Sequence, residues 1–115
     1  MKTNDVITLY VGYIEGKGGK RRPVIVRKIS NQGLMAFKVT TKYANKSEYI
    51  KQQYYSVHDW AEAGLKQQSW IDIGNIYEFK NKNLQVKKIG HLTAKDQIGL
   101  ARFNTEFKLK RKYKK

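Results

Sequence analysis

Two short motifs combine cations with hydroxyl groups in a pattern that suits phosphate chemistry. Residues 20–22 read Lys-Arg-Arg and stand directly before the chain's only proline, and residues 40–42 read Thr-Thr-Lys. Guanidinium and ammonium groups donate charge-assisted hydrogen bonds to phosphate oxygens, and a threonine hydroxyl adds a neutral donor and acceptor. If the two motifs meet at one end of a sheet, they form a pocket for a phosphodiester.

The segments next to these motifs predict two neighbouring strands. Residues 24–29 are rich in β-branched side chains and begin after the proline, which is tolerated at the first position of a strand. An Asn-Gln-Gly turn signal separates them from the apolar residues 34–40. Such a short connection predicts an antiparallel hairpin, in which the start of the first strand lies beside the end of the second. Arg22 and Thr41 are therefore expected to be neighbours.

Similar patterns predict the remaining elements. Further strands are expected at residues 6–14, 48–57, 69–73, 75–79 and 84–89, with a bend or bulge at Gly74. A short helical turn is expected at residues 59–64, capped by Asp59 and Gly64, and a helix is expected to begin after Thr93 and end near Leu109. The prediction is a mainly β fold: a strongly twisted antiparallel β-barrel with a short helix and a C-terminal α-helix. It forms one domain over residues 1–109, followed by a basic tail at 110–115.

The charge balance favours a polyanionic partner. The chain has 24 Lys and Arg against 9 Asp and Glu, which gives a formal net charge of +15. Residues 108–115 hold six of the cations, so the rest of the chain still has 18 basic and 9 acidic residues. A basic body binds RNA, DNA or anionic lipid. Tyr54, Tyr55, Trp60 and Trp70 can offer stacking faces among the cations, although most aromatic side chains are expected in the core.

Metal, cofactor and membrane functions find no support in the composition. Cysteine is absent, and His58 and His91 are the only histidines, without the spacing of a metal site. We therefore predict no metal and no cofactor. The first residues lack the long apolar stretch of a signal peptide, and no apolar run approaches the length of a membrane span. These features predict a cytoplasmic protein that is not attached to a membrane.

The order of the motifs resembles the PemK/MazF family of toxin endoribonucleases. The resemblance begins with a glycine-rich loop, Lys-Arg-Arg-Pro-Val-Ile-Val at 20–26 and Val-Thr-Thr-Lys at 39–42. It continues at residues 64–72 and at 90–93, so that it covers about residues 6–107. It implies a barrel related to SH3 and a homodimer. It also implies metal-independent, sequence-specific cleavage of single-stranded RNA, and a cognate antitoxin as partner.

The resemblance also implies roles for single residues. Arg22 and Thr41 match catalytic positions, and Asp72 matches a position that contacts substrate. In RNA the 2′-hydroxyl can attack the adjacent phosphorus, so the protein must supply proton transfer and stabilise charge on the phosphorane. The guanidinium of Arg22 is always charged and suits the second task. Thr41 is expected to orient the phosphate or the 2′-hydroxyl.

The flanking residues have more than one interpretation. Contacts with substrate phosphates are expected from Lys20, Arg21, Thr40 and Lys42. Strand alternation gives Arg21 an alternative, because it would point to the opposite face from Arg22. Asp72 also has an alternative, as a carboxylate bonded within a turn or a dimer contact. The two histidines match no catalytic position of the family and are expected to have structural or surface roles, so the group that transfers the proton is not identified.

Two other functions stay open at this point. A non-catalytic nucleic-acid-binding barrel explains the charge and the aromatic residues equally well, and predicts RNA binding without cleavage. A toxin of related fold that acts on a protein target, such as a topoisomerase, predicts toxicity without RNA cleavage. The basic residues 108–115 are expected to add non-specific affinity or to dock an antitoxin, and membrane attachment through them is a weaker alternative.

Overall fold

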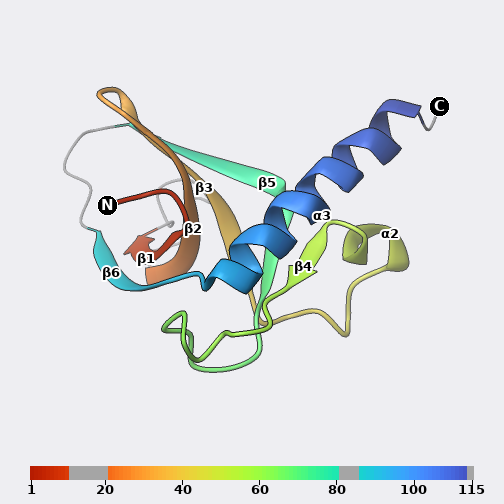
Figure 1. Cartoon of the computed structure of the whole chain (residues 1–115), viewed down its shortest axis with the longest axis horizontal. Coiled ribbons are helices and arrows are strands. Elements are labelled where there is room, and N and C mark those ends of the chain that lie inside the picture. Colours follow the sequence, from red (N-terminus) through yellow and green to blue (C-terminus); the bar gives the residue numbers. More distant parts are fainter. Residues whose placement is uncertain (11–20, 81–85, 114–115) are drawn as a thin grey trace.

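The computed structural model describes residues 1–10, 21–80 and 86–113 and has a mainly β architecture (Figure 1). Six strands form one antiparallel sheet in the order β4-β5-β3-β2-β1-β6. The strands are β1 (Asp5–Tyr10), β2 (Arg21–Ser30), β3 (Gly33–Thr40), β4 (Tyr54–Ser56), β5 (Trp70–Lys80) and β6 (Lys87–His91), and the helices are α2 (Glu48–Lys51) and α3 (Ala94–Tyr113). The predicted mainly β class with a short helix and a C-terminal helix is confirmed.

The sheet differs from the prediction in that it does not close into a barrel. Strands β4 and β6 lie at its two edges, and within the described residues they do not pair with each other. Strand β1 instead joins β2 to β6, and a register shift between Val6 and Ile7 interrupts its pairing with β6. The result is an open, twisted sheet with hydrophobic residues packed on both faces.

The predicted hairpin of β2 and β3 is confirmed. Its pairs include Val24 with Lys38 and Ile25 with Phe37, and a register shift lies between Val26 and Lys28. The predicted irregularity at Gly74 is also confirmed, as a bulge inside one continuous strand. Phe37 pairs with Ile76, yet the next residue of β3 pairs with Asp72, so residues 73–75 of β5 form the extra length.

Two local predictions are wrong. Residues 48–57 were expected as one strand, but helix α2 comes first and only Tyr54–Ser56 is extended. The hydroxyl of Ser47 caps this helix by accepting a hydrogen bond from Ile50 N at 3.2 Å, and this cap outweighs the β propensity of Tyr49 and Ile50. Residues 59–64 form hydrogen-bonded turns instead of a helix, although Gly64 has the positive φ of +88° that a C-terminal cap requires.

The ends of the other elements also differ from expectation. Strand β6 begins at Lys87, later than the predicted residue 84, and residues 81–85 lie outside the described residues. The same is true of residues 11–20, which include the end of the first predicted strand and the glycine-rich loop. Helix α3 continues to Tyr113, beyond the predicted end at Leu109, so residues 110–113 of the predicted basic tail are helical.

Two hydrophobic clusters occupy opposite faces of the sheet. Ile25 belongs to the larger cluster, whereas its neighbours Val24 and Val26 belong to the smaller one, as strand alternation requires. Helix α3 covers the larger cluster with Leu100 and Phe103 and then projects away from the sheet (Figure 1). Its last turns are exposed and basic. Within the described residues, no helix is long and apolar enough to cross a membrane.

Candidate nucleic-acid interface

Residues of three neighbouring strands form a row at the end of the sheet where β2 begins and β3 ends. The last pair of these two strands is Val24 with Lys38, and continuing the register by two residues brings Arg22 opposite Thr40. Thr40 pairs on its other side with Trp70, the first residue of β5. Residues directly opposite each other in antiparallel strands share a face. Arg22, Thr40 and Trp70, which we call the end row, therefore lie on the same face.

The two arginines of the first motif lie on opposite faces. Arg22 pairs with Leu9, which belongs to the smaller hydrophobic cluster, and so shares the face of that cluster. Arg21 pairs with Tyr10, and its Nη1 lies 3.3 Å from Thr8 Oγ1 and 3.4 Å from the Thr8 carbonyl oxygen. Arg21 therefore takes the alternative position that strand alternation predicted for it.

The polar groups near the end row are accessible. Arg22 is exposed, and within the described part of the chain no hydrogen bond or ion pair holds its guanidinium. Thr40 Oγ1 accepts a hydrogen bond from Lys42 N at 3.1 Å, which leaves its hydroxyl proton available for donation. Thr41 and Lys42 follow the end of β3 and are exposed. The strand arrangement agrees with the expected closeness of the two motifs, but the register brings Thr40, not Thr41, opposite Arg22. Lys20 lies outside the described residues.

Asp72 lies two pairs further into the sheet than Trp70 and is only 2% exposed. Its carboxylate accepts hydrogen bonds from Gln53 Nε2 at 2.8 Å, Gly74 N at 3.0 Å and Asn75 Nδ2 at 2.7 Å. Burial, together with the charge of Asp72, raises the pKa of the neighbouring Tyr54 hydroxyl. These contacts fit the alternative interpretation of Asp72, in which the carboxylate organises a turn; here that turn is the bulge of β5.

A stacked aromatic pair adjoins the end row. The rings of Tyr43 and Trp70 are nearly parallel, with an interplanar angle of 6° and centroids 4.7 Å apart. Lys51 Nζ lies 4.9 Å from the centroid of Tyr43. Both aromatic side chains are partly exposed, and neither belongs to the two hydrophobic clusters. The loop that follows Thr40 thus brings an aromatic ring back over the first residue of β5.

The other three aromatic residues that the sequence offered as stacking faces are less accessible. Tyr54 and Tyr55 are buried, and Trp60 packs against the larger cluster. Tyr43 was not predicted as a stacking residue, because only the path of the loop brings it to Trp70.

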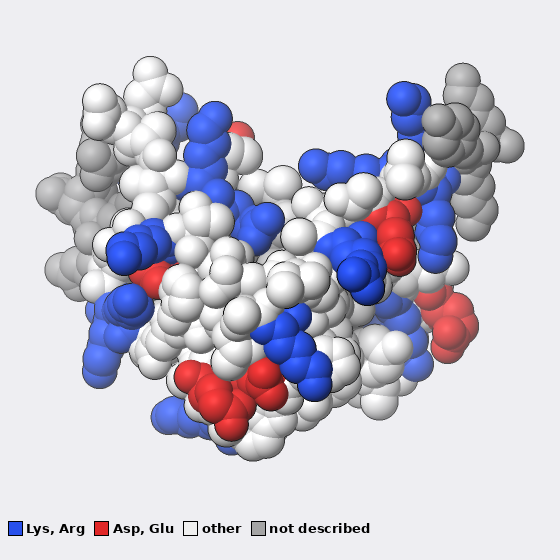
Figure 2. All heavy atoms as spheres, viewed as in Figure 1, with Lys and Arg blue, Asp and Glu red and all other residues white. Residues whose placement is uncertain are grey.

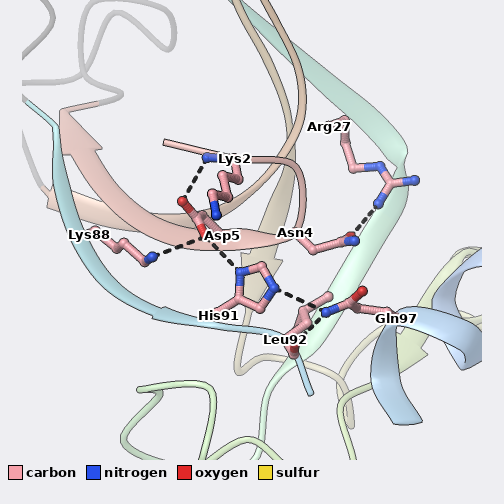
Figure 3. Close-up of polar contacts among 8 residues, drawn as sticks. All are labelled: Lys2, Asn4, Asp5, Arg27, Lys88, His91, Leu92 and Gln97. Carbon is pink, nitrogen blue, oxygen red and sulfur yellow. Dashed lines mark hydrogen bonds and ion pairs between the residues drawn. The ribbon is translucent and has the colours of Figure 1, made fainter. Parts of the chain in front are cut away.

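Asp5 forms a second polar centre, at the opposite end of β1 from Leu9 (Figure 3). Its buried carboxylate accepts from Lys2 N at 2.8 Å and lies 2.6 Å from His91 Nδ1 and 3.3 Å from Lys88 Nζ. Burial alone would raise the pKa of Asp5, but the hydrogen bonds from these three residues and the charge of Lys88 outweigh it. The pKa of Asp5 is therefore below its ordinary value.

The amide of Gln97 fixes the tautomer of neutral His91. Gln97 Nε2 lies 3.0 Å from His91 Nε2 and also donates to the Leu92 carbonyl at 2.8 Å. Because an amide nitrogen can only donate, His91 Nε2 accepts, and Nδ1 carries the proton that it donates to Asp5. Asp5 is four residues from Leu9, the partner of Arg22, which is about 13 Å along an extended strand. His91 therefore ties together β1, β6 and α3 and lies far from the end row, in agreement with its expected structural role.

Asp96 forms a third polar centre, inside the first turn of α3. Its buried carboxylate accepts from the Tyr55 hydroxyl at 2.7 Å and from the backbone N–H groups of His58 and Asp59 at 2.9 and 2.8 Å. Burial, then the hydrogen bond and charge of Asp96, raise the pKa of Tyr55. An acid in the first turn suits the positive end of the helix, and here it also binds the segment after β4.

Figure 2 shows Lys and Arg side chains scattered over the visible face, several of them at the projecting end of α3. A groove of about 680 Å³ lies between α2 and α3, and its lining consists of Tyr49, Gln52, Phe103, Glu106, Phe107, Lys110 and Arg111. The guanidinium of Arg111 lies 4.7 Å from the centroid of Phe107 and 5.7 Å from that of Tyr49. Aromatic and cationic groups therefore also meet in this groove.

Within the described residues, no group of three or more His, Cys, Asp or Glu side chains is arranged to hold a metal ion. Comparison with models of known protein families finds no match for this chain, and comparison with curated proteins finds no significant match either. The assignment of a function therefore depends on the residues and their geometry.

Proposed function

We propose that the protein binds single-stranded RNA at the end row and cleaves it there without a metal ion, acting in the cytoplasm as the toxin of a toxin–antitoxin pair. The observation that carries the proposal is the exposed guanidinium of Arg22 at the start of β2, where continuing the register of the confirmed hairpin brings Thr40 opposite it. Thr41 and Lys42 follow directly and add a further hydroxyl and cation. The net charge of +15 supports a polyanionic substrate.

The proposed reaction uses the nucleophile of the RNA itself. The 2′-oxygen forms a bond to the adjacent phosphorus while the bond to the 5′-oxygen breaks, which leaves a 2′,3′-cyclic phosphate and a 5′-hydroxyl. One proton leaves the 2′-hydroxyl and one reaches the departing 5′-oxygen. Arg22 stabilises the additional charge on the phosphorane oxygens, and the hydroxyls of Thr40 and Thr41 orient the phosphate. Asp72 supports the strand from inside the bulge, since its carboxylate is occupied by three internal donors.

The proposed partners follow from the resemblance to toxin endoribonucleases. They are a cognate antitoxin and a second copy of this chain. The exposed basic half of α3 supports an acidic segment as the neutralising partner, because opposite charges steer association.

RNA cleavage in EDTA tests the proposal. A mixed-sequence single-stranded RNA is incubated with wild type, Arg22→Ala, Thr40→Val and Thr41→Val, and the product ends are mapped. Arg102→Ala is the matched control, because Arg102 is an exposed arginine of α3 outside the end row. We expect discrete cuts by wild type and the control, and a loss of about 10²- to 10³-fold for Arg22→Ala, the effect of removing one donor to a developing charge. Equal cleavage by Arg22→Ala and wild type would exclude Arg22 from the catalytic site.

A non-catalytic nucleic-acid-binding protein is the second candidate, and one observation favours it. The Tyr43–Trp70 stack adjoins the end row, and stacking faces among cations serve binding without any reaction. This candidate predicts salt-sensitive RNA binding by folded wild type with no product in the same EDTA reaction.

A further inference from the structure

The end row combines two kinds of group that a nucleotide needs. Arg22 offers an exposed guanidinium, and Trp70, two strands away, offers an indole ring on the same face. Neighbouring strands lie about 5 Å apart, so the two backbone positions are separated by about 10 Å. This separation is short enough for a phosphate at Arg22 to belong to the nucleotide whose base reaches the indole.

The stack of Tyr43 on Trp70 lies beside the buried ring of Tyr54, which is 6.1 Å from the ring of Tyr43 between centroids. Both rings of the stack remain partly exposed and lie outside the two clusters that form the hydrophobic cores. Tyr43 covers one face of the indole at a centroid distance of 4.7 Å, and so holds the ring in a fixed orientation. The ammonium of Lys51 adds a positive charge on Tyr43, 4.9 Å from its centroid. The arrangement is a rigid aromatic platform beside two exposed or partly exposed polar groups.

We propose that Trp70 is a base-stacking subsite of the end row. The phosphate of a single-stranded nucleic acid binds to Arg22 and Thr40, and the adjoining base stacks on the part of the Trp70 ring that Tyr43 leaves uncovered. Stacking on an indole accepts every base, so the subsite adds affinity and fixes the position of the strand without reading its sequence. This inference rests on the proposed function, because it assumes that the end row binds the RNA backbone.

Binding of oligonucleotides with and without bases tests the subsite. The first probe is a 2′-O-methyl RNA, which lacks the free 2′-hydroxyl needed for cleavage, and the second is an abasic phosphodiester chain of the same length. Binding to wild type, Trp70→Ala, Trp70→Phe and Arg22→Ala is measured by fluorescence anisotropy. Thermal unfolding of each variant verifies that it is folded.

The two side chains are expected to act on different probes. Trp70→Ala weakens binding of the base-bearing RNA about tenfold and leaves the abasic chain unchanged, because only the base loses its stacking partner. Trp70→Phe retains most of the affinity, and Arg22→Ala weakens binding of both probes. Equal affinity of Trp70→Ala and wild type for the base-bearing RNA would overturn the inference, and so would an equal loss for both probes.

A second readout does not depend on the folding of the alanine variant. In Trp60→Phe, the only remaining tryptophan is Trp70, and stacking is expected to quench its fluorescence with the base-bearing RNA but not with the abasic chain. Unchanged fluorescence at saturating RNA would overturn the subsite. Base-dependent quenching together with the absence of RNA cleavage would support the subsite and exclude the nuclease. The experiment therefore distinguishes failure of the stacking subsite from failure of the proposed nuclease function.

Discussion

Replacing Gly99 with alanine is expected to destabilise the protein, contrary to the usual effect in a helix. An alanine inside a helix is favoured over glycine by about 1 kcal/mol. Here, however, the new Cβ would lie 2.3 Å from the Tyr55 hydroxyl oxygen and 3.0 Å from Cζ. Tyr55 cannot move freely, because it is buried, donates to Asp96 at 2.7 Å and packs edge-on against Phe103 at 5.7 Å.

The size of the effect follows from the contact that must break. Displacing the phenol removes a hydrogen bond to a charged group, which contributes about 1.5–3 kcal/mol. After the helix preference is subtracted, Gly99→Ala should lower the free energy of unfolding by about 0.5–2 kcal/mol. Thr105→Ala, at an exposed position of α3, is the control and should be neutral or slightly stabilising.

A double-mutant cycle measured by urea unfolding separates the cause. In a Tyr55→Phe background the hydroxyl is absent, so the loss caused by Gly99→Ala should shrink by about 1 kcal/mol or more. If Gly99→Ala stabilises wild type by about 1 kcal/mol, as at an ordinary helical glycine, the close approach of Tyr55 to α3 is refuted.

Three further predictions concern the other polar groups. Because the pKa of Asp5 is lowered from 3.8 on folding, its carboxylate stabilises the protein above that pH, and this contribution disappears as the pH falls through the lower folded value. Asp5→Asn should therefore show a smaller acid-induced fall of Tm than wild type. Parallel curves of Tm against pH for the two proteins would contradict the lowered pKa of Asp5. Asp72→Asn should lower the free energy of unfolding by about 1–3 kcal/mol without changing RNA affinity; a loss of affinity at unchanged stability would assign Asp72 to substrate binding. Lys108→Gln with Lys110→Gln should reduce the slope of log affinity against log salt by about 1.4 if both contact single-stranded RNA, and an unchanged slope would place the projecting end of α3 outside the interface.

The local patterns predicted the elements that position the end row. The short turn and β-branched runs were sufficient for the β2–β3 hairpin, because the antiparallel direction of the two strands follows from a tight connection. Gly74 correctly indicated a bulge, and Thr93 correctly indicated the start of α3, where its hydroxyl lies 3.4 Å from Asp96 N. These features depend on neighbours in the sequence, so composition and spacing are enough to find them.

The remaining features depend on contacts between distant residues. Asp5 and His91 are 86 positions apart, and no spacing rule connects them. The identity of the threonine opposite Arg22 depends on register, and a shift of one residue exchanges Thr40 for Thr41 and one face for the other. Helix α2 depends on a single cap at Ser47, which strand propensity cannot reveal.

Cleavage of an RNA with one altered sugar tests the central claim most directly. Once a cut is mapped, wild type in EDTA is given that RNA and a matched RNA with a single 2′-deoxy nucleotide on the 5′ side of the cut. We predict that the unmodified RNA gives a 2′,3′-cyclic phosphate and a 5′-hydroxyl, and that the deoxy substitution abolishes this cut alone. Cleavage of the deoxy substrate, or the absence of any cut by folded wild type, would contradict attack by the 2′-hydroxyl at a phosphate held by Arg22.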